Sequence, residues 1–487
     1  MSPARVRIGF AVCLVTILLA VLDTNIVSAA TVPIVRDLDP VHGMDKIPWL
    51  ISSFALASAA VLPLYGKLCD TIGAKKVFVG AIATFLAGSA LCGAAQSMAQ
   101  LIAARAVQGI GGGGLMSVTM VVLAQLSGPR SAGGQSDAKG GGRGKGGSIG
   151  GIVAGAGMAL GPWLGGTLAD HASWRWIFYV NLPVGIAVLA TAIAVLRLPV
   201  QPVRHRIDYP GAVLAAAFSV SLLLMTEWGG KDYAWGSPQI LGLGVAGAVS
   251  LALFLRRQAT AAEPILPLSM FKVPAVRLGF AIQALVGAAM MGTLVYVMIY
   301  LQVVRHLEPT AAGLYLIPMA LGMTAVGLAS ERLAARGWSQ KTFALLGTVA
   351  AAAALGLLAT TRVSTNLWQI RGELLLMGAG FGLLVGQLIQ IVQAAAPPQQ
   401  LGVATTGTRF FQTLGNALGA AVFGTILSRV YEAKGVGGST SELSRLGGAA
   451  HEAGVRALTS GMDVVFVVGA ALMALAAYLA TRLPHTP

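Results

Sequence analysis

The sequence predicts an all-α integral membrane protein, from its composition and from the recurrence of long apolar runs. Of its 487 residues, 56% are hydrophobic and 10% are charged, and the mean hydropathy is +0.76. In a typical soluble domain, by contrast, about 25% of the residues are charged. Segments of about 20 apolar residues, each long enough to cross a hydrocarbon core of about 30 Å, recur from one end of the chain to the other. These observations exclude a soluble fold.

Fourteen such runs can be recognised, and each is expected to form one membrane-spanning helix. The first run is too long for a removable signal peptide and lacks the small-residue cleavage site, so it is taken as the first helix. The fourteen expected helices cover residues 8–33, 49–68, 77–95, 100–123, 147–168, 177–196, 209–226, 238–255, 278–301, 311–329, 342–360, 368–391, 403–427 and 464–481.

The basic residues predict how these helices are oriented. An even number of spans places both termini on one side of the membrane. Most of the 33 Lys and Arg residues fall in cytoplasmic segments when the termini are placed inside, as the positive-inside rule requires. We therefore expect a multi-pass protein of the inner (cytoplasmic) membrane, surrounded by the lipid bilayer, with both termini in the cytoplasm.

The same bias accounts for the pI of about 10.1 without a nucleic-acid partner. The tract "AKGGGRGKGG" at 138–147 joins two expected helices on the cytoplasmic side, so it is interpreted as a flexible linker and not as an RNA-binding segment. The three cysteines, Cys13, Cys69 and Cys92, fall in helices or on the cytoplasmic side, and no disulfide framework is expected.

The pattern of reactive residues argues against an enzyme. The six histidines fall in loops or tails, and no two are close in sequence. No P-loop precedes a helix, which argues against ATP-driven transport. No metal or organic cofactor is expected. A receptor or scaffold would need a soluble output domain, and we expect none beside the apolar runs.

One ionisable residue stands out in the first run. The stretch "LLAVLDTNIVSAATV" places Asp23 among residues that carry no other charge between Ile8 and Pro33. An ionisable residue inside a membrane helix costs several kcal/mol to insert, so it is a candidate functional residue by default.

Several motifs resemble those of the major facilitator superfamily, and in particular those of its fourteen-helix drug:proton antiporters of the EmrB/QacA type. The likeness covers nearly the whole chain, and the motifs occur in the family's order. They are "LDTNIVSAATVP" (22–33), "GKLCDTIGAKK" (66–76), "RAVQGIGGGG" (105–114), "GMALGPWLGG" (157–166), "WRWIFYVNLPVG" (174–185), "EPILPLSMF" (263–271) and "AGLYLIPMALGM" (312–323).

The resemblance implies the architecture and the function. Residues 1–198 would form an N-terminal six-helix bundle, 199–260 a two-helix insert, and 261–487 a C-terminal six-helix bundle. Such a protein exports amphipathic or lipophilic compounds in exchange for protons, by alternating access to a site between the bundles. Multidrug efflux by a monomer is the expected function. An exporter of a specific native lipid or secondary metabolite on the same fold is the alternative.

Asp23 and Arg105 lie at similar depths and are the expected proton-coupling residues. With 1.5 Å of rise per residue, Asp23 lies roughly 22 Å from the inner end of its helix, and Arg105 roughly 8 Å below the outer surface. An arginine partner would favour the charged carboxylate, and a displaced arginine would favour protonation, with Gln108 nearby. The alternatives are a static ion pair for Asp23 and a tie to backbone carbonyls for Arg105.

The segment "GKLCDTIGAKK" is expected to act as a gating loop, through Gly66, Asp70, Gly73 and Lys75. In the family, this loop and its aspartate hold the cytoplasmic side closed through helix-end contacts. Here Thr71 and Ala74 stand where arginine is usual, so a weaker hold is expected, and a merely solvated loop is the alternative.

The segment "GMALGPWLGG" resembles the motif by which antiporters of the family are recognised. Its glycines are spaced by four residues, which creates a smooth helix face for close packing and sliding; an ordinary small-residue interface is the alternative. The residues concerned are Gly157, Gly161, Pro162, Gly165 and Gly166.

A further group of polar residues within the expected helices is predicted to line the substrate cavity. Glu373 is a second candidate charge, found by aligning "MGAGFGLL" (377–384) with "QGIGGGGL" (108–115); the alternative is a position at the membrane interface, with the helix beginning after it. Interhelical hydrogen bonds are the alternative role for the polar stripes on two of the later helices. The predicted cavity residues are Asn25, Gln108, Glu373, Gln387, Gln390, Arg409 and Gln412, with Asn416 on the same helix face as the last two.

Overall fold

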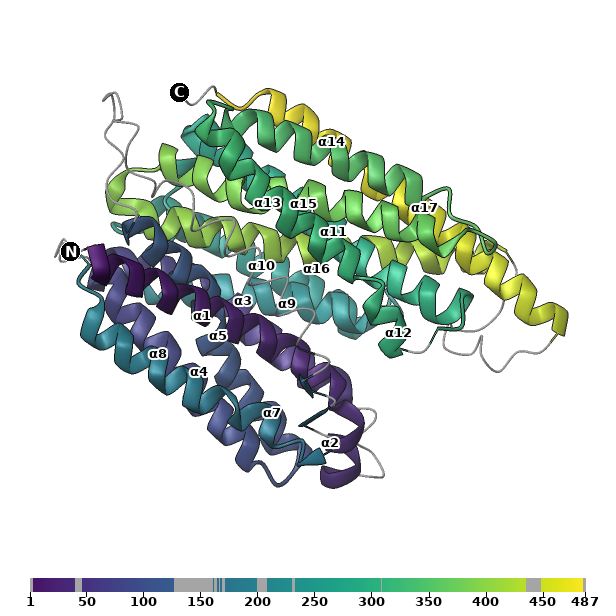
Figure 1. The fold of residues 1–487 in the computed structure, drawn as a ribbon, viewed down its shortest axis with the longest axis horizontal. Coiled ribbons are helices and arrows are strands. Elements are labelled where there is room, and N and C mark those ends of the chain that lie inside the picture. Colours follow the sequence, from purple (N-terminus) through teal and green to yellow (C-terminus); the bar gives the residue numbers. More distant parts are fainter. Residues whose placement is uncertain are drawn as a thin grey trace. The chain divides into compact units, whose positions relative to one another are not determined.

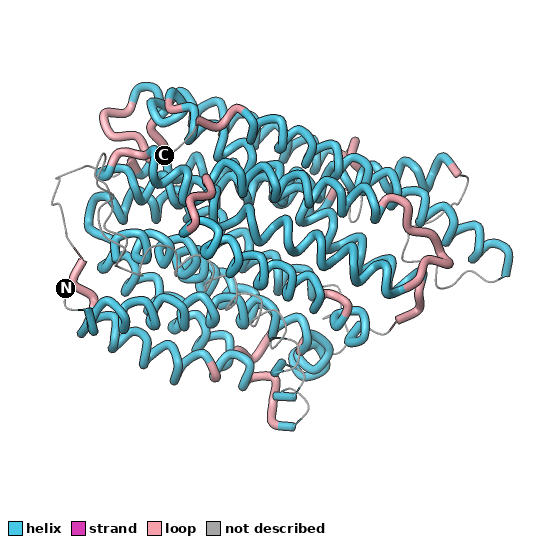
Figure 2. The backbone as a smooth tube through the Cα atoms, turned by 45° about the horizontal axis from the view of Figure 1, so that its top comes forward, coloured by secondary structure: helices cyan, strands magenta, loops and turns pink. Residues whose placement is uncertain are grey.

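The computed structural model describes residues 3–39, 46–126, 161, 164–165, 167–168, 171–198, 208–229, 233–307, 309–434 and 448–484. Within these ranges the helices are joined by loops and turns, and the only other regular feature is an isolated bridge between Gly229 and Tyr233 (Figure 2). The prediction of an all-α membrane protein is therefore confirmed for the described part of the chain.

The chain divides into two compact units. The first comprises Met1–Ser221, Ala246–Val276 and Val392–Phe410, and the second comprises Leu222–Val245, Arg277–Ile391 and Phe411–Pro487. Five helices are divided between the units: α9, α10, α11 (near its start), α15 and α16. This partition therefore does not test the predicted boundaries at 198 and 260.

The first unit contains the N-terminal helices (Figure 1). Within it, α5 packs against α3 and α4, and α1 packs against α5 and α8. The helices are α1 (Pro3–Ala29), α2 (Thr31–Leu38), α3 (Ile47–Leu68), α4 (Ala74–Ala94), α5 (Met98–Leu126), α7 (Trp176–Tyr179), α8 (Asn181–Val195), α9 (Tyr209–Trp228) and α10 (Pro238–Thr260), the last two in part.

The second unit contains most of the later helices, and α14 and α17 pack against each other there. Aromatic contacts join α11 to α16, among them the stacked rings of Phe280 and Phe411, whose centroids are 4.9 Å apart. The helices are α11 (Pro274–Ile299), α12 (Pro309–Leu314), α13 (Ile317–Ala335), α14 (Gln340–Leu358), α15 (Leu367–Ala395), α16 (Leu401–Ala433) and α17 (Gly448–Thr481).

The number of membrane spans differs from the sequence prediction. Twelve stretches of the described residues are long and apolar enough to cross a membrane, so the expected fourteen are not confirmed. Two expected helices, 49–68 and 77–95, fall within one continuous stretch of 46 residues, Trp49–Ala94. The expected helix at 147–168 lies outside the described residues, apart from five isolated positions.

Two helices that were expected to be continuous are interrupted, and proline marks both places. The first expected helix is divided into α1 and α2 at Ala30, and the sixth into α7 and α8 at Val180. Pro33 lies in the first turn of α2 and Pro183 in the first turn of α8, where a residue without an N–H is tolerated because that turn has no helical acceptor for it. The second interruption places the buried Asn181 at the first position of α8.

Close packing around α4 and α5 builds the core of the first unit. Phe78, Phe85 and Ile82 on α4 are almost completely buried. The glycines of α5 at 111–114 lie against α3 and α4, because their missing side chains let the backbones approach. This core fixes the position of α5, which carries the arginine of the site described next.

Candidate functional site

Asp23 lies on α1 and is completely buried. Three side chains from two other helices donate hydrogen bonds to its carboxylate. Arg105 Nη1 lies 2.9 Å from Oδ2, Gln108 Nε2 2.7 Å from Oδ1, and Asn181 Nδ2 2.8 Å from Oδ1. The carboxylate therefore has one charged and two neutral donors, which is what a buried ion needs to offset its desolvation.

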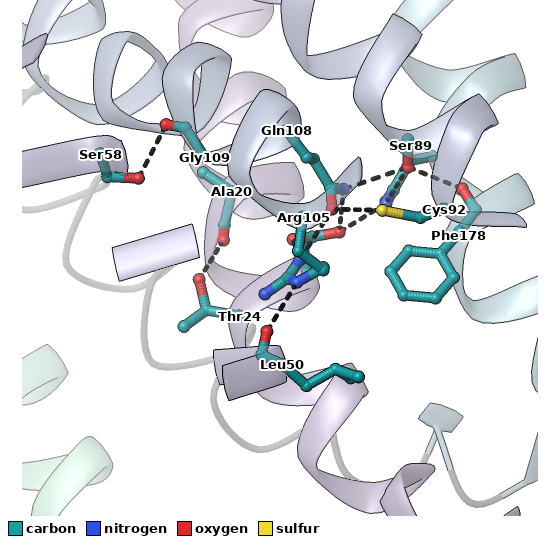
Figure 3. Close-up of polar contacts among 12 residues, drawn as sticks. Ala20, Thr24, Leu50, Ser58, Ser89, Cys92, Arg105, Gln108, Gly109 and Phe178 are labelled. Atoms are coloured by element: carbon teal, nitrogen blue, oxygen red, sulfur yellow. Dashed lines mark hydrogen bonds and ion pairs between the residues drawn. The ribbon is translucent and has the colours of Figure 1, made fainter. Parts of the chain in front are cut away.

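Arg105 on α5 has partners besides the aspartate (Figure 3). Its Nε donates to the backbone oxygen of Leu50 at 3.2 Å, and its Nη1 also donates to Gln108 Oε1 at 2.7 Å. The guanidinium carbon lies 4.4 Å from the ring centroid of Phe54. Both of the roles considered from the sequence, the ion pair and the tie to a backbone carbonyl, are thus present in one side chain.

Sequence reasoning missed three members of this cluster. Ser89 Oγ accepts hydrogen bonds from Gln108 Nε2 at 3.2 Å and from Asn181 Nδ2 at 3.1 Å, and it donates to the oxygen of Phe178 at 3.0 Å. Cys92 Sγ lies 3.5 Å from Gln108 Oε1. The signal for Asn181 was its place two residues before Pro183 in "FYVNLPVG"; nothing in the sequence distinguishes Ser89 or Cys92 from other small helical residues.

The cluster forms a closed polar network among apolar helices. Every side chain in it other than Asp23 and Arg105 is neutral, so the network holds one negative and one positive charge. Removing either charge leaves the other buried without a charged partner.

Glu373 lies on α15 in the second unit and is 3% exposed. It accepts a hydrogen bond from Gln369 Nε2 at 2.8 Å and a longer one from Thr361 Oγ1 at 3.5 Å. The neighbouring Arg371 is turned elsewhere: its guanidinium lies over the rings of Tyr315 and Trp368, at 4.5 and 4.4 Å. Glu373 is thus a buried carboxylate with neutral partners.

The other predicted cavity residues are dispersed. Gln387 and Gln412 are buried, at 7% and 8% exposure, and Arg409 is partly buried. Gln390 Oε1 accepts a hydrogen bond from Gln340 Nε2 at 3.0 Å, which is the interhelical role considered for it. Asn25 belongs to α1, but its side chain lies outside the described part of the structure.

The predicted gating loop caps a helix. Asp70 follows α3 in a π-helical turn, Cys69–Gly73, and belongs with Val392–Phe410 to the first unit. Its carboxylate accepts hydrogen bonds from the backbone N–H groups of Gly402 at 2.7 Å and Val403 at 2.9 Å. These N–H groups are in the first turn of α16 and have no helical acceptor. A carboxylate there also interacts favourably with the helix dipole.

Glycines make this contact possible. A Cβ on Gly66 would lie 2.9 Å from Val403 Cα and would also meet Thr406, so no larger residue fits between α3 and α16. Gly73 has a φ of 91°, a conformation that side chains disfavour. Lys75 does not pair with Asp70; its Nζ donates to the oxygen of Ile193 on α8 at 2.7 Å.

A second contact of the gating loop was not predicted. Lys67 Nζ lies 3.3 Å from Glu263 Oε2, and the two side chains are only 11% and 25% exposed. Glu263 begins the segment "EPILPLSMF" that follows α10. The gating loop therefore has a paired positive charge at Lys67, although it lacks the arginines that are usual in the family at positions 71 and 74.

The antiporter motif is only partly visible. Gly161 and Gly165 are buried, whereas Gly157, Pro162 and Gly166 lie outside the described residues. The packing role of this segment stays a prediction. Within the described ranges, no group of three or more His, Cys, Asp or Glu residues could hold a metal ion.

A cluster at the end of α2 lies outside the membrane-spanning segments. Asp37 accepts hydrogen bonds from Trp174 Nε1 at 2.9 Å and Arg175 Nη1 at 2.6 Å, and Arg175 Nη2 donates to the oxygen of Ala95 at 3.1 Å. The hydrogen bonds from Trp174 and Arg175 lower the pKa of Asp37 below its ordinary value. The cluster joins α2 to the segment before α7.

Comparison with known proteins identifies the family. The model of the Major Facilitator Superfamily matches residues 12–420. The chain is 33% identical to Multidrug resistance protein 3 of Bacillus subtilis over 425 residues, covering 86% of this chain and 79% of that protein. It is 36% identical to an uncharacterized MFS-type transporter of Mycobacterium tuberculosis, covering 88% of this chain. The chain spans only 60% of the length of that mycobacterial relative.

Solved structures agree on the fold. The human organic anion transporter MFSD10 superimposes with a TM-score of 0.65 at 17% identity, over 99% of this chain and 100% of that one. The proton:xylose symporter XylE superimposes with the same score at 14% identity, over 100% of this chain and 97% of that one. The chain belongs to the Major Facilitator Superfamily, a family of membrane transporters and not of enzymes.

Proposed function

We propose that the chain is a proton-coupled exporter that drives amphipathic or lipophilic compounds out of the cell in exchange for inward protons. The observation that carries this proposal is the buried pair of Asp23 and Arg105, 2.9 Å apart, inside membrane-spanning helices of the first unit. A buried ionisable pair in a transporter is expensive to insert and marks a proton or substrate pathway.

The partners of Arg105 are suited to a proton switch. When Asp23 is charged, it accepts hydrogen bonds from Arg105, Gln108 and Asn181. When a proton binds to it, the guanidinium loses its counter-ion but keeps the oxygen of Leu50, the amide oxygen of Gln108 and the ring of Phe54. Arg105 therefore has acceptors that do not depend on the charge of Asp23, which reduces the cost of the protonated state.

The names of relatives support export. Besides Multidrug resistance protein 3, the multidrug transporter protein MdtP of Bacillus subtilis is 31% identical over 416 residues, covering 85% of this chain and 74% of that protein. We transfer from these names a cargo of several different drugs; that these are amphipathic and move outward is part of our own proposal.

The gating loop gives the proposal a conformational step. Asp70 joins the end of α3 to the first turn of α16, a contact that can form and break as the transporter changes conformation. Lys67 and Glu263 make a second contact at the same loop. These two contacts are the proposed cytoplasmic hold, in place of the arginines that the loop lacks.

Fourteen crossings remain our proposal for the topology. The stretch Trp49–Ala94 has 46 residues, or about 69 Å of helix, which is more than twice the thickness of a hydrocarbon core of about 30 Å. It therefore supplies two crossings, and the remaining one is the helix expected from the sequence at 147–168, which lies almost wholly outside the described residues. The helices α9 and α10 then form the two-helix insert between six-helix bundles, and both termini lie in the cytoplasm.

Uptake of ethidium into everted membrane vesicles with an imposed proton gradient tests the proposal. The native chain is expected to concentrate the dye, and Asp23→Asn to abolish the gradient-driven part, because the amide cannot exchange a proton. Thr24→Ala, a change of the neighbouring residue, is the matched control and is expected to keep uptake.

The other outcomes are informative. If Asp23→Asn still concentrates dye against a gradient, Asp23 is not the coupling residue, and Glu373→Gln is the next variant. If the native chain moves no dye while a native lipid or secondary metabolite is transported, the cargo is specific, and the multidrug assignment is wrong.

A further inference from the structure

A groove on the second unit is formed by none of the residues that hold Asp23. It has a volume of about 480 Å³ and is formed by Trp235 on one side and by six residues of α16, between Ala421 and Val430, on the other. All of these residues belong to the second unit. The volume is in the range of small-molecule sites, about 300–1,000 Å³.

The groove lies on the outward face of α16. Phe423 and Leu427, four residues apart, are buried, and the ring of Phe423 packs edge-on against Tyr296 of α11. The groove residues alternate with these at helical spacing, so they occupy a different face. Val422 is 47% exposed, which shows that this face is turned away from the protein.

The middle of the groove offers no free polar group of α16 to a ligand. Thr425 is the one uncharged polar residue among its α16 residues, and its hydroxyl donates to the oxygen of Ala421 at 2.7 Å. The hydroxyl is therefore satisfied within its own helix. A ligand in this part of the groove must be hydrocarbon.

Trp235 is held in place by the loop between α9 and α10. Its ring lies against Gly229, where an added Cβ would come within 2.7 Å of the ring carbons. Two bonds in the following turn fix the loop: Ser237 N donates to Ala234 O at 2.9 Å, and Ile240 N donates to Ser237 Oγ at 3.4 Å. Tryptophan is enriched at the membrane–water interface, where a loop joining two spans must lie.

The groove follows α16 from its apolar part to its first charge after Arg409. Residues 410–428 of α16 carry no charge, and Arg429 follows them. From Ala421 to Val430 the groove extends about 14 Å along the helix. Arg429 is exposed. A positive charge thus stands at the interfacial end of an apolar channel.

We propose that this groove binds an anionic phospholipid, with one acyl chain along α16 beside Trp235 and the phosphate at Arg429. The apolar wall matches hydrocarbon, and the planar guanidinium matches phosphate oxygens. Attraction between the cation and an anionic headgroup distinguishes this site from ordinary lipid contact. The inference does not depend on the transported cargo or on proton coupling.

Quenching of tryptophan fluorescence by brominated lipids tests the proposal on the full chain. The protein is reconstituted into phosphatidylcholine vesicles containing either phosphatidylglycerol or phosphatidylcholine with brominated acyl chains. The difference in emission between the native chain and Trp235→Phe isolates the signal of Trp235. Half-maximal quenching of Trp235 is expected at a fraction of brominated phosphatidylglycerol about fivefold lower than the fraction of brominated phosphatidylcholine that is needed. This ratio corresponds to about 1 kcal/mol, the contribution of one interfacial basic residue.

Two variants separate the site from general attraction to the membrane. Arg429→Gln is expected to abolish the preference for phosphatidylglycerol. Arg256→Gln, which removes an exposed arginine from the last turns of α10, is expected to keep it. If Arg429→Gln does not fold, Arg429→Lys and rising salt serve instead, and the preference should weaken with salt because a single exposed cation is screened.

Three results would overturn the proposal: equal quenching of Trp235 by both headgroups, a preference that survives in Arg429→Gln, or no quenching of Trp235 by either lipid. The last would show that lipid does not enter the groove.

Discussion

Asp23 and Glu373 are both buried carboxylates on membrane-spanning helices, but they are held by different kinds of partner. Asp23, in the first unit, is bound by a guanidinium and two amides. Glu373, in the second unit, is bound by an amide and a hydroxyl, and no basic side chain bonds it within the described chain. Burial disfavours the charged form of a carboxylate, and a neighbouring cation favours it.

Distance along the chain does not decide which pairing forms. Arg371 is two residues from Glu373, yet its guanidinium lies over two aromatic rings. Arg105 is 82 residues from Asp23 and pairs with it. Side chains at i and i+2 diverge on a helix, so a partner for a buried charge comes from another helix. The first unit therefore holds a charge pair, and the second holds a carboxyl group that needs no counter-ion when protonated.

Arg105→Leu is expected to cause the largest loss of unfolding free energy, because it leaves the charge of Asp23 buried without a cation. Breaking a buried ion pair on one side costs about 3–5 kcal/mol of unfolding free energy. Thermal unfolding of the purified protein in detergent, calibrated with a denaturant titration, measures the loss. The double variant Asp23→Asn/Arg105→Leu should be more stable than Arg105→Leu alone. Additive losses in the two single variants would contradict the pairing.

Asn181→Leu is expected to cost less, because the ion pair survives. The change removes a hydrogen bond to the charged carboxylate and one to Ser89, and a hydrogen bond to a charged group contributes about 1.5–3 kcal/mol. The same unfolding assay is applied to Asn181→Leu in the native chain and in an Asp23→Asn background, where the charge of the carboxylate is absent. An equal loss of unfolding free energy in both backgrounds would show that Asn181 does not stabilise the charge of Asp23.

The sequence predicted the helices well because a hydrocarbon environment requires long apolar runs. It did not predict the interruptions at Ala30 and Val180, because a uniformly apolar run has no period that marks a break. Pro33 and Pro183 stood in the quoted motifs, but a proline inside an apolar run is also compatible with a continuous, kinked helix.

Only the part of the site that follows from the depth of a residue along its helix was predicted. The estimated depths placed Asp23 and Arg105 at one level, and the structure brings them together. Asn181 was missed because its position depends on the break before α8. Glu263 was missed because its pairing with Lys67 depends on how the segment after α10 folds back, which no local pattern specifies.

Asp70→Ala tests a third way of holding a carboxylate, by backbone N–H groups. Removing a carboxylate that caps a helix costs about 0.5–2 kcal/mol, less than the loss of a buried ion pair. Accessibility of a cysteine introduced at Thr406, measured by reaction with a maleimide in membranes, should increase when the contact is lost. Asp70→Asn retains an oxygen that can accept a hydrogen bond, so its maleimide reaction rate should lie between those of the chain with Asp70 and of Asp70→Ala. An unchanged reaction rate in Asp70→Ala would argue against a hold at this loop.

Glu373→Gln directly tests the contrast with Asp23. The amide is nearly the same size and keeps an acceptor for Gln369, and no cation is left unpaired. The expected loss of unfolding free energy is below about 1 kcal/mol, the net value of one neutral hydrogen bond. A loss as large as that of Arg105→Leu would mean that a cation balances Glu373 and that the two units hold their carboxylates in the same way.

Replacing Asp37 is expected to change the stability least, since its side chain is 49% exposed and solvent screens its interactions. Hydrogen bonds from Trp174 and Arg175 lower the pKa of Asp37. A carboxyl whose pKa is lower in the folded state stabilises that state above the ordinary value, 3.8, and loses this contribution as the pH falls through the lowered value. The contribution of Asp37 should therefore be constant between pH 8 and pH 5 and decline only below about pH 4.

Comparing the native chain with Asp37→Asn isolates that contribution, because the amide does not titrate. The difference in unfolding temperature between the two should be flat over the neutral range and shrink in acid. A difference that already changes between pH 8 and pH 6 would have to come from a group with a higher pKa, and the hydrogen bonds from Trp174 and Arg175 would then not govern the charge of Asp37.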